Sequence, residues 1–273
     1  MCLSLVACTS SQSCHCRSGE TRSGRGRITM RLEGKAAIIT GVGHSGQAGF
    51  ALAQAFAHEG AKLVICARNP ERVKALAQQL KTEGATVIGV AADLTTEEGA
   101  KLLIDKAVEA YGSIDILVNL AGGLSKFGPS DELTLADWDH EINNNLRTAF
   151  LCIRAVWPIM RRQGSGKILN FSRAGGVEGS GAMMVAYNCA KAGVDALTRT
   201  FAHEGKKLGI YVNAIGPGLL ITRTNLESMK PTPADLSTKW VSLDKLAEAA
   251  IFLVSSASDG VNGVILPVKG RNI

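Results

Sequence analysis

From residue 30 onward, short runs of apolar residues alternate with longer segments in which apolar residues recur at helical spacing. Several runs are nearly continuous in valine, isoleucine, leucine and alanine, which is typical of parallel strands covered by helices on both faces. The pattern predicts strands at Ala36–Thr40, Leu63–Ala67, Val87–Ala91, Ile114–Leu120, Lys167–Phe171, Tyr211–Ile215 and Val264–Val268. It predicts helices between them at residues 47–59, 71–83, 97–111, 134–162, 185–207 and 243–256.

This alternation predicts a single α/β domain of the Rossmann type. We expect a doubly wound parallel sheet of about seven strands, with helices on both faces and right-handed crossovers. Residues 30–273 are expected to form this domain, because no repeat or linker divides them. Residues 1–29 have no periodic apolar pattern, and Met30 begins MRLEGKAAIITG, where a compact domain would naturally start. We therefore expect residues 1–29 to be a disordered N-terminal extension.

Composition and charge exclude several kinds of partner. No apolar run approaches the ~20 residues of a membrane span, so a soluble protein without a membrane partner is expected. The net charge of +6 is concentrated at the start, where arginines outnumber acidic residues. Because no basic patch alternates with aromatic residues in the remainder of the chain, nucleic acid is not expected as a partner.

The cysteines indicate the compartment. Cys66, Cys152 and Cys189 lie in apolar settings, which predicts buried thiols, a reducing environment and a cytoplasmic location. The serine- and arginine-rich residues 1–29 would also suit import into an organelle. Cys14-His15-Cys16 lacks a second ligand pair at zinc-site spacing, so no metal site is expected.

The segment TGVGHSGQAG, residues 40–49, follows the first predicted strand and precedes the first predicted helix. Gly41, Gly43 and Gly46 have the G-x-G-x-x-G spacing in this context, which predicts a pyrophosphate site at the start of the helix. At the end of the second predicted strand, an acidic residue would repel the 2′-phosphate of NADP(H). Ala67 stands there instead, and Arg68 follows it. Arg68 therefore favours NADP(H) as the cofactor. NAD(H) stays possible, because Arg68 could be a solvated arginine at a helix start.

Tyr187 and Lys191 stand four residues apart in LNFSRAGGVEGSGAMMVAYNCAK, residues 169–191. Together with the glycine segment, NLAG at residues 119–122 and Pro217-Gly218, they resemble the short-chain dehydrogenase/reductase family over residues 30–270. The resemblance implies an oxidoreductase that moves hydride between nicotinamide and a carbonyl or alcohol substrate, with a 3-oxoacyl compound or small ketone as the commonest case. It also implies a homodimer or homotetramer, formed through the helices at 134–162 and 185–207.

The resemblance implies roles for individual residues. Tyr187 would exchange a proton with the substrate oxygen, and Lys191 would hold the nicotinamide ribose and lower the pKa of Tyr187. Asn145 would kink its helix and anchor a water molecule to Lys191, and Ser172 is the candidate for the catalytic serine. The expected cofactor contacts are Gly41, Gly43, Gly46, Gly49, Arg68, Asp93, Leu94, Asn119, Ala121, Gly122, Tyr187, Lys191, Pro217, Gly218 and Thr222.

The sequence departs from the family pattern at the catalytic serine. That serine should align with Arg173 or Ala174, whereas Ser172 comes one or two residues early and Ser180 lies further along. A shifted strand end could present Ser172 to the substrate oxygen, or no serine takes part. The glycine loop is also one residue longer than is usual in the family, which leaves open which glycine faces the pyrophosphate.

Two alternatives to this function stay open. Residues 222–240 resemble the equivalent stretch of dihydropteridine reductase, which implies NADH, a quinonoid pterin substrate and no catalytic serine. The altered glycine loop and Arg173 would also fit a dinucleotide-binding sensor with little catalysis. Retention of Asn145, Tyr187 and Lys191 argues against a pure binding protein.

Overall fold

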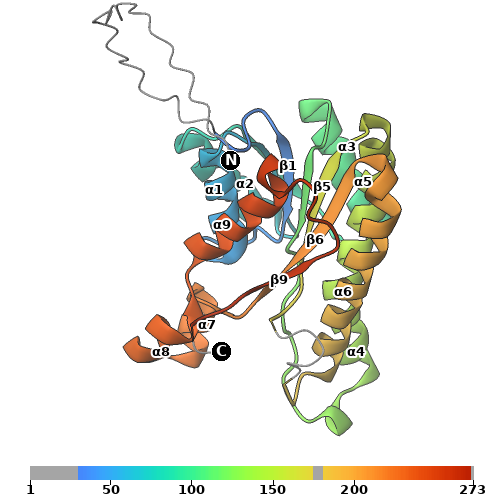
Figure 1. Cartoon of the computed structure of the whole chain (residues 1–273). Coiled ribbons are helices and arrows are strands. Elements are labelled where there is room, and N and C mark those ends of the chain that lie inside the picture. Colours follow the sequence, from blue (N-terminus) through green and yellow to red (C-terminus); the bar gives the residue numbers. More distant parts are fainter. Residues whose placement is uncertain (1–29, 175–180, 272–273) are drawn as a thin grey trace, which may run out of the picture.

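The computed structural model describes residues 30–174 and 181–271, so the expected extension, residues 1–29, and the alternative serine Ser180 lie outside it. Within the described residues, seven parallel strands form one sheet in the order β3-β2-β1-β4-β5-β6-β9 (Figure 1). This arrangement confirms the predicted single α/β sheet. The strands are β1 Ala36–Thr40, β2 Lys62–Ala67, β3 Val87–Ala91, β4 Ile116–Asn119, β5 Gly166–Phe171, β6 Ile210–Pro217 and β9 Ile265–Val268.

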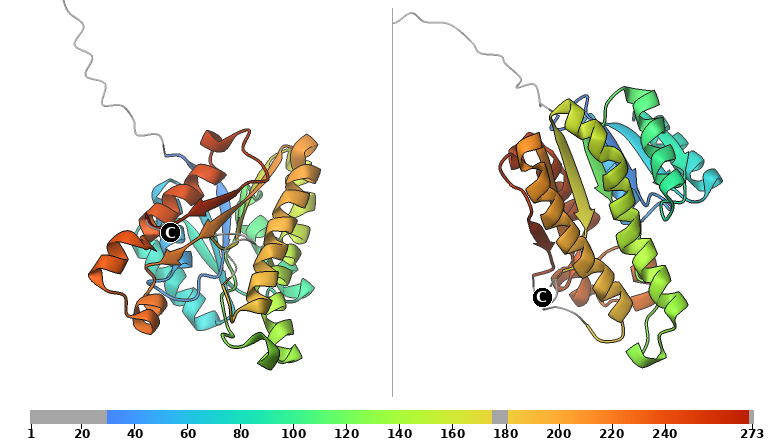
Figure 2. Two further views of the ribbon diagram at one scale, coloured as in Figure 1. Left: turned by 60° about the horizontal axis from the view of Figure 1, so that its bottom comes forward. Right: turned by 90° about the vertical axis from the view of Figure 1, so that its right-hand side faces the viewer.

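Helices cover both faces of the sheet, with α1, α2 and α9 on one face and α3, α5 and α6 on the other (Figures 1 and 2). Two buried apolar clusters, one on each face, form the core. The long helices are α1 Ala48–His58, α2 Pro70–Thr82, α3 Glu97–Tyr111, α4 Leu135–Ile142, α5 Thr148–Gln163, α6 Val185–Gly205 and α9 Leu243–Val254. The short ones are α7 Arg223–Met229, α8 Pro233–Thr238, η1 Ser130–Glu132, η3 Lys206–Leu208 and η4 Ser256–Ser258, together with a π-helical turn, η2 Asn143–Arg147.

The last crossover differs from the expectation that all crossovers are right-handed. Strands β4, β5, β6 and β9 follow one another in the same direction across the sheet. The connections through α5 and α6 pass over one face, whereas α9 passes over the opposite face and packs beside α1 (Figure 1). The β6–α9–β9 connection therefore has the opposite hand. It covers apolar residues of β5 and β6 on the α1 face that α6 cannot reach.

The segment between β6 and α9 contains elements that the apolar pattern does not predict. Helices α7 and α8 lie here, and two short parallel strands pair, β7 Leu219–Leu220 with β8 Trp240–Val241. Thr222 and Thr232 cap the two helices by accepting hydrogen bonds from Asn225 and Asp235 N–H. Each element is too short to show a periodic signal, which is why the sequence pattern missed them.

The prediction of three buried cysteines is wrong for one of them. Cys66 and Cys152 are buried, and burial raises the pKa of both thiols. Cys189 is exposed. It lies on α6 between Ala186 and Ala190, which face the core, and therefore points outward on the helix surface.

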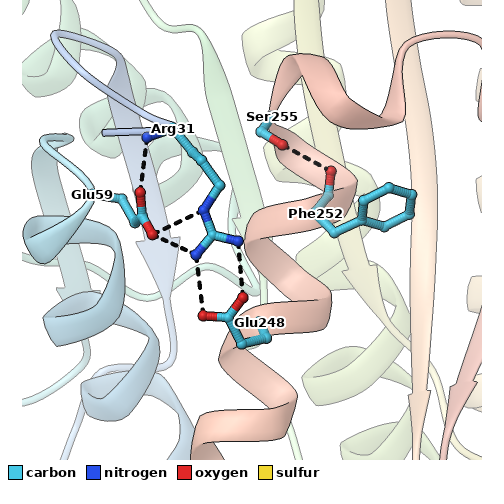
Figure 3. Close-up of polar contacts among 5 residues, drawn as sticks. All are labelled: Arg31, Glu59, Glu248, Phe252 and Ser255. Carbon is cyan, nitrogen blue, oxygen red and sulfur yellow. Dashed lines mark hydrogen bonds and ion pairs between the residues drawn. The ribbon is translucent and has the colours of Figure 1, made fainter. Parts of the chain in front are cut away.

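Arg31 joins three separate parts of the chain close to where the described residues begin (Figure 3). Its guanidinium donates hydrogen bonds to both oxygens of Glu248 on α9, at 2.8 and 3.1 Å. Its Nε donates to Glu59 at the end of α1 at 2.8 Å, and its backbone N–H donates to the other Glu59 oxygen at 2.8 Å. Hydrogen bonds from Arg31 lower the pKa of both carboxyls. We refer to Arg31, Glu59 and Glu248 as the Arg31 clamp.

Replacing Arg31 with alanine is expected to destabilise the fold modestly. The Arg31 side chain is 37% exposed, so solvent screens the ion pairs and about 1 kcal/mol is a reasonable loss. In a domain of this size that corresponds to a melting temperature lower by roughly 2–4 °C. Because both carboxyl pKa values are lowered on folding, the clamp stabilises at neutral pH and its contribution fades as the pH falls below about 4.3.

Thermal unfolding of both proteins at pH 7 and pH 4 measures this effect. Lys101→Ala is the matched control, because it removes a single exposed ion pair with Asp105 within α3 and should change the melting temperature by less than Arg31→Ala. If both variants melt together at pH 7, the clamp contributes nothing to stability.

Candidate active site

A cleft of about 520 Å³ opens at the carboxyl ends of β1, β2, β3 and β4. The strand order reverses between β1 and β4, and ligands of doubly wound sheets bind at such a point. The cleft brings together many of the residues predicted to contact a cofactor: Gly41, Gly43, Gly49, Arg68, Asp93, Leu94, Ala121 and Gly122. Residues that the sequence reasoning missed also line it: His44, Gln47, Asn69, Arg72, Thr95, Leu120, Asn144 and Thr148.

The glycine loop fits close to the neighbouring backbone. Gly41 has φ +78°, and a Cβ there would lie 2.9 Å from the backbone nitrogen of Ala121. A Cβ on Gly49 would lie 2.6 Å from the Gly41 carbonyl oxygen. Helix α1 starts here without a side-chain cap and with no acidic residue in its first turn, so its free N–H groups suit an anion such as a pyrophosphate.

Gly46 occupies a different position from the other glycines. Its carbonyl oxygen accepts a hydrogen bond from Arg223 N–H at 3.0 Å, and it is absent from the residues that line the cleft. The extra residue in the loop therefore carries Gly46 toward α7. Gly41, Gly43 and Gly49 are the glycines of this loop that line the cleft.

Basic side chains gather where the second strand ends. Arg68 and Arg72 both line the cleft, and Arg72 Nη1 lies 2.8 Å from His44 Nε2. Asp93 is close by, and its pKa is lowered, chiefly by hydrogen bonds from Thr95 and also by the charge of Arg68. Arg72 lies in the first turn of α2, whereas Arg68 precedes the helix, so helical spacing does not relate the two and the sequence pattern could not identify Arg72. A guanidinium pair of this kind offers charge-assisted hydrogen bonds to a phosphate.

Several other predicted contacts lie away from the cleft lining. Asn119 is 6% exposed, and its amide donates to Asn170 on β5 at 2.9 Å; Asn170 in turn donates to Thr198 on α6 at 2.9 Å. Pro217 is the last residue of β6, and its carbonyl accepts from Ala174 N–H at 2.9 Å, while Gly218 N–H donates to the Val268 carbonyl of β9 at 2.9 Å. Their contacts with a cofactor, and that of Thr222, stay predictions.

Asn145 lies in the π-helical turn η2, which interrupts the long predicted helix between α4 and α5. Its Oδ1 accepts from Gly123 N–H at 2.8 Å, and its Nδ2 donates to the Gly123 carbonyl at 3.0 Å and to the Glu141 carboxylate at 2.9 Å. Glu141 is 1% exposed and also accepts from the backbone N–H of Lys126 at 2.8 Å. Asn145 and Glu141 therefore fix the loop after β4, beside the cleft.

Tyr187 and Lys191 lie together on α6, with Lys191 Nζ 5.6 Å from the centre of the Tyr187 ring. The Nζ is buried and donates to the Phe171 carbonyl at the end of β5 at 2.8 Å. Burial lowers the pKa of Lys191 to about 8, although the carboxylates of Asp195 and Glu141 oppose this. The lysine amine is therefore buried beside the ring of the tyrosine.

The environment of Tyr187 differs from the sequence expectation. Burial raises the pKa of Tyr187, the Arg173 guanidinium lowers it, and the Glu141 charge raises it further. The expectation assigned the lowering charge to Lys191, whereas the cation that has this effect in the structure is Arg173. Residue spacing alone could not reveal this, because Arg173 lies in a loop whose course the pattern does not determine.

Ser172 is buried against α6. It is 3% exposed, and its hydroxyl lies 3.5 Å from the Lys191 carbonyl oxygen. Arg173 is the next residue, and its Nη1 donates to Asn188 Oδ1 at 2.6 Å. Burial of Ser172 argues against its contact with a substrate, and Arg173 is the side chain that reaches the surroundings of Tyr187.

Among residues 30–174 and 181–271, no group of three or more histidine, cysteine, aspartate and glutamate side chains is placed to hold a metal ion. No helix of these residues is both long enough and apolar enough to cross a membrane.

Comparison with known proteins places the chain among dinucleotide-dependent enzymes. The family model for short chain dehydrogenases matches residues 35–232. The D-threitol dehydrogenase of Mycolicibacterium smegmatis is 33% identical over 247 residues, which cover 88% of this chain and 94% of that protein. The 2-dehydro-3-deoxy-D-gluconate 5-dehydrogenase of Escherichia coli is 34% identical over 250 residues, covering 88% and 95%.

Solved structures give the same result. The crystal structure of a gluconate 5-dehydrogenase from Burkholderia cenocepacia, in complex with NADP and tartrate, matches with a TM-score of 0.81. The two proteins are 33% identical, and the match covers 89% of this chain and 96% of that one.

Proposed function

The chain belongs to the short chain dehydrogenase family, and from this premise we propose that it is an NADP(H)-dependent oxidoreductase that interconverts a carbonyl and an alcohol. The observation that carries the proposal is the Tyr187–Lys191 pair on α6, next to the loop that Asn145 and Glu141 hold beside the cleft. A bound nicotinamide would supply the hydride to the carbonyl carbon, or accept it in the reverse reaction.

The residues of this chain would handle the proton and the binding. Tyr187 gives a proton to the carbonyl oxygen during reduction and removes it from the alcohol during oxidation. Lys191, whose Nζ lies 5.6 Å from the centre of the Tyr187 ring, would hold the cofactor ribose. Gly41, Gly43 and Gly49, with the free N–H groups of α1, would hold the pyrophosphate.

The preference for NADP(H) is supported by the basic end of the cleft. Arg68 and Arg72 supply two guanidinium groups where the second strand ends, and no acidic residue stands at position 67. The structurally similar gluconate 5-dehydrogenase carries NADP in its crystal structure. Both observations weigh against the NADH preference that the dihydropteridine reductase resemblance implied.

Oxidation of NADPH and of NADH across ketones, aldehydes and quinonoid pterin tests the proposal. We expect turnover with NADPH and small polar ketones, as relatives that act on a polyol and on a sugar acid suggest. Burial of Ser172 fits the serine-free chemistry of a pterin reductase, so the pterin is part of the panel. Binding of NADPH without turnover of any carbonyl would favour the sensor alternative.

We also propose that the protein forms a homodimer through η2, α5 and α6. A groove of about 670 Å³ runs along these elements and is lined mainly by apolar side chains, among them Leu146, Phe150 and Phe201. Phe150 is 40% exposed there. Figure 2, right, faces this side, where α5 and α6 run side by side. A second copy of the same face would cover the groove and keep these side chains from water.

Replacing Phe150 with glutamate is expected to convert the dimer to monomer, because a charge would be buried opposite its own copy in a two-fold interface. Light scattering after size exclusion gives the mass. Leu102→Glu, at a 43% exposed leucine on α3, is the control and should leave the mass unchanged. A monomeric wild-type protein would contradict the proposal.

A further inference from the structure

We propose that Arg173 binds a carboxylate of the substrate and so selects carbonyl compounds that carry a carboxylate next to the reacting carbon. This proposal rests on the proposed function, because it assigns the carboxylate a place beside a carbonyl that is reduced. It concerns a position at which this chain departs from its family, since the resemblance puts a neutral serine hydroxyl there.

The backbone holds Arg173 in a fixed position at the end of β5. Ser172 N–H donates to the Ile215 carbonyl at 2.8 Å, and Ala174 N–H donates to the Pro217 carbonyl at 2.9 Å. The residues on both sides of Arg173 are therefore tied to β6. Arg173 comes two residues after Phe171, the last residue of β5, whose carbonyl accepts a hydrogen bond from Lys191 Nζ.

The side chain is held beside the catalytic tyrosine. Arg173 Nη1 donates to Asn188 Oδ1 at 2.6 Å, and Asn188 Nδ2 donates to the Gly181 carbonyl at 2.9 Å. Asn188 directly follows Tyr187 on α6, and the Arg173 charge lowers the pKa of Tyr187. The hydrogen bond to Asn188 holds the guanidinium against the turn of α6 that carries Tyr187, where it can bind an anion next to the tyrosine.

The charge of Arg173 lacks a counter-charge in the described part of the chain. It is half-buried, and no carboxylate of residues 30–174 and 181–271 forms an ion pair with it. A guanidinium has five N–H donors, and the bond to Asn188 uses one of them. Its planar fork fits a carboxylate with two parallel hydrogen bonds, which a serine hydroxyl cannot provide. A substrate carboxylate would supply both the missing charge and the missing acceptors.

The test compares acids with their esters. Reduction of pyruvate against methyl pyruvate, and of 2-oxobutanoate against methyl 2-oxobutanoate, is followed with NADPH. In Arg173→Ser, we expect kcat/KM for the acids to fall by roughly ten- to a hundredfold, and kcat/KM for the esters to change little. Arg173→Lys should keep part of the preference, and Arg161→Ala, at an exposed arginine of α5, should keep all of it. An acid-to-ester ratio that is unchanged in Arg173→Ser overturns the proposal and leaves the proposed function intact.

Binding of oxamate, an inert analogue of a 2-oxo acid, gives a readout that does not need turnover. Calorimetry on the NADPH-saturated protein should show roughly tenfold weaker binding in Arg173→Ser. If no carbonyl is turned over, the proposed function fails, and equal oxamate affinity in the two proteins overturns the role of Arg173 as well. Glu178 lies outside the described residues, and Glu178→Gln should leave the acid-to-ester ratio unchanged. A preference for acids that appears only in that variant would mean that the chain itself neutralises Arg173, which overturns the proposal.

The pH profile of alcohol oxidation separates a charge effect from a merely structural one. The charged groups that act on Tyr187 are Arg173 at the end of β5 and Glu141 on α4; Lys191 on α6 lies beside the ring, and Asp195 and Glu141 act on Lys191. Removing the Arg173 cation raises the pKa of Tyr187, so the rise of activity should move to higher pH in Arg173→Ser. The profile should stay in place in Arg173→Lys. A profile that does not move in Arg173→Ser contradicts the charge contact on which the proposal depends.

Discussion

Replacing Tyr187 with phenylalanine is expected to reduce turnover by at least ~10²-fold, because general acid–base catalysis of this kind contributes ~10²–10⁴-fold. The substitution removes one hydroxyl and keeps the ring on α6. Affinity for NADPH should therefore stay within a few fold of the wild-type value. Steady-state rates with the best carbonyl of the panel, and titration of the free protein with NADPH, measure the two effects separately.

Two further variants sharpen this test. Tyr111→Phe removes the hydroxyl of a partly buried tyrosine on α3, which donates to the Leu63 carbonyl at 3.0 Å far from the cleft. It should retain activity. Lys191→Ala should lose both turnover and cofactor affinity, because in the proposed mechanism the lysine supports the tyrosine and holds the ribose. Substantial turnover in Tyr187→Phe would remove the tyrosine from the mechanism.

Replacing Arg68 with alanine is expected to raise the KM for NADPH by roughly ten- to a hundredfold, while the KM for NADH changes little. Charge-assisted bonds to the 2′-phosphate contribute ~1.5–3 kcal/mol, and ~1.4 kcal/mol corresponds to a factor of ten. NADH has no such phosphate, so the loss is specific. The variant lacking both Arg68 and Arg72 should lose more than either single variant, because both side chains line the same end of the cleft.

The reverse change completes the experiment. An aspartate at position 67, combined with Arg68→Ala, should favour NADH, because it repels a 2′-phosphate and accepts from the 2′-hydroxyl. Arg154→Ala, which removes an exposed arginine paired with Glu97, is the control for a general effect of lost charge. A wild-type protein that prefers NADH would make Arg68 an ordinary surface arginine and strengthen the case for a pterin reductase.

The sheet could be predicted because its strands are buried on both faces. The run Ala36–Ile39 is apolar at every position, and the structure has strand β1 at these residues and Thr40. The fourth strand was predicted to end at Leu120, whereas β4 ends at Asn119. Leu120 is apolar and so extends the pattern, but its N–H donates to the Thr40 hydroxyl at 3.0 Å. A local apolar pattern also does not indicate which face of the sheet a connecting helix covers. The hand of the β6–α9–β9 connection could therefore not be predicted from it.

The candidate site was predictable where spacing along one element determines geometry. Tyr187 and Lys191 share one face of α6 because they are one helical turn apart. Side chains brought together from separate elements were not predictable in this way. The hydrogen bond from Asn145 to Glu141 depends on a π-helical turn, and the effect of Arg173 on Tyr187 depends on the path of a loop.

The hydrogen bonds that link Asn119, Asn170 and Thr198 constrain how this protein can evolve. They join β4 to β5 and β5 to α6, and all three side chains are buried. A single change to an apolar residue leaves a neighbouring amide or hydroxyl without its partner, at a cost of about 1–3 kcal/mol. Replacing all three at once with apolar groups of similar shape would avoid most of that cost. Each intermediate on the way is less stable than either end, so the three positions are expected to change together in descendants of this chain or not at all.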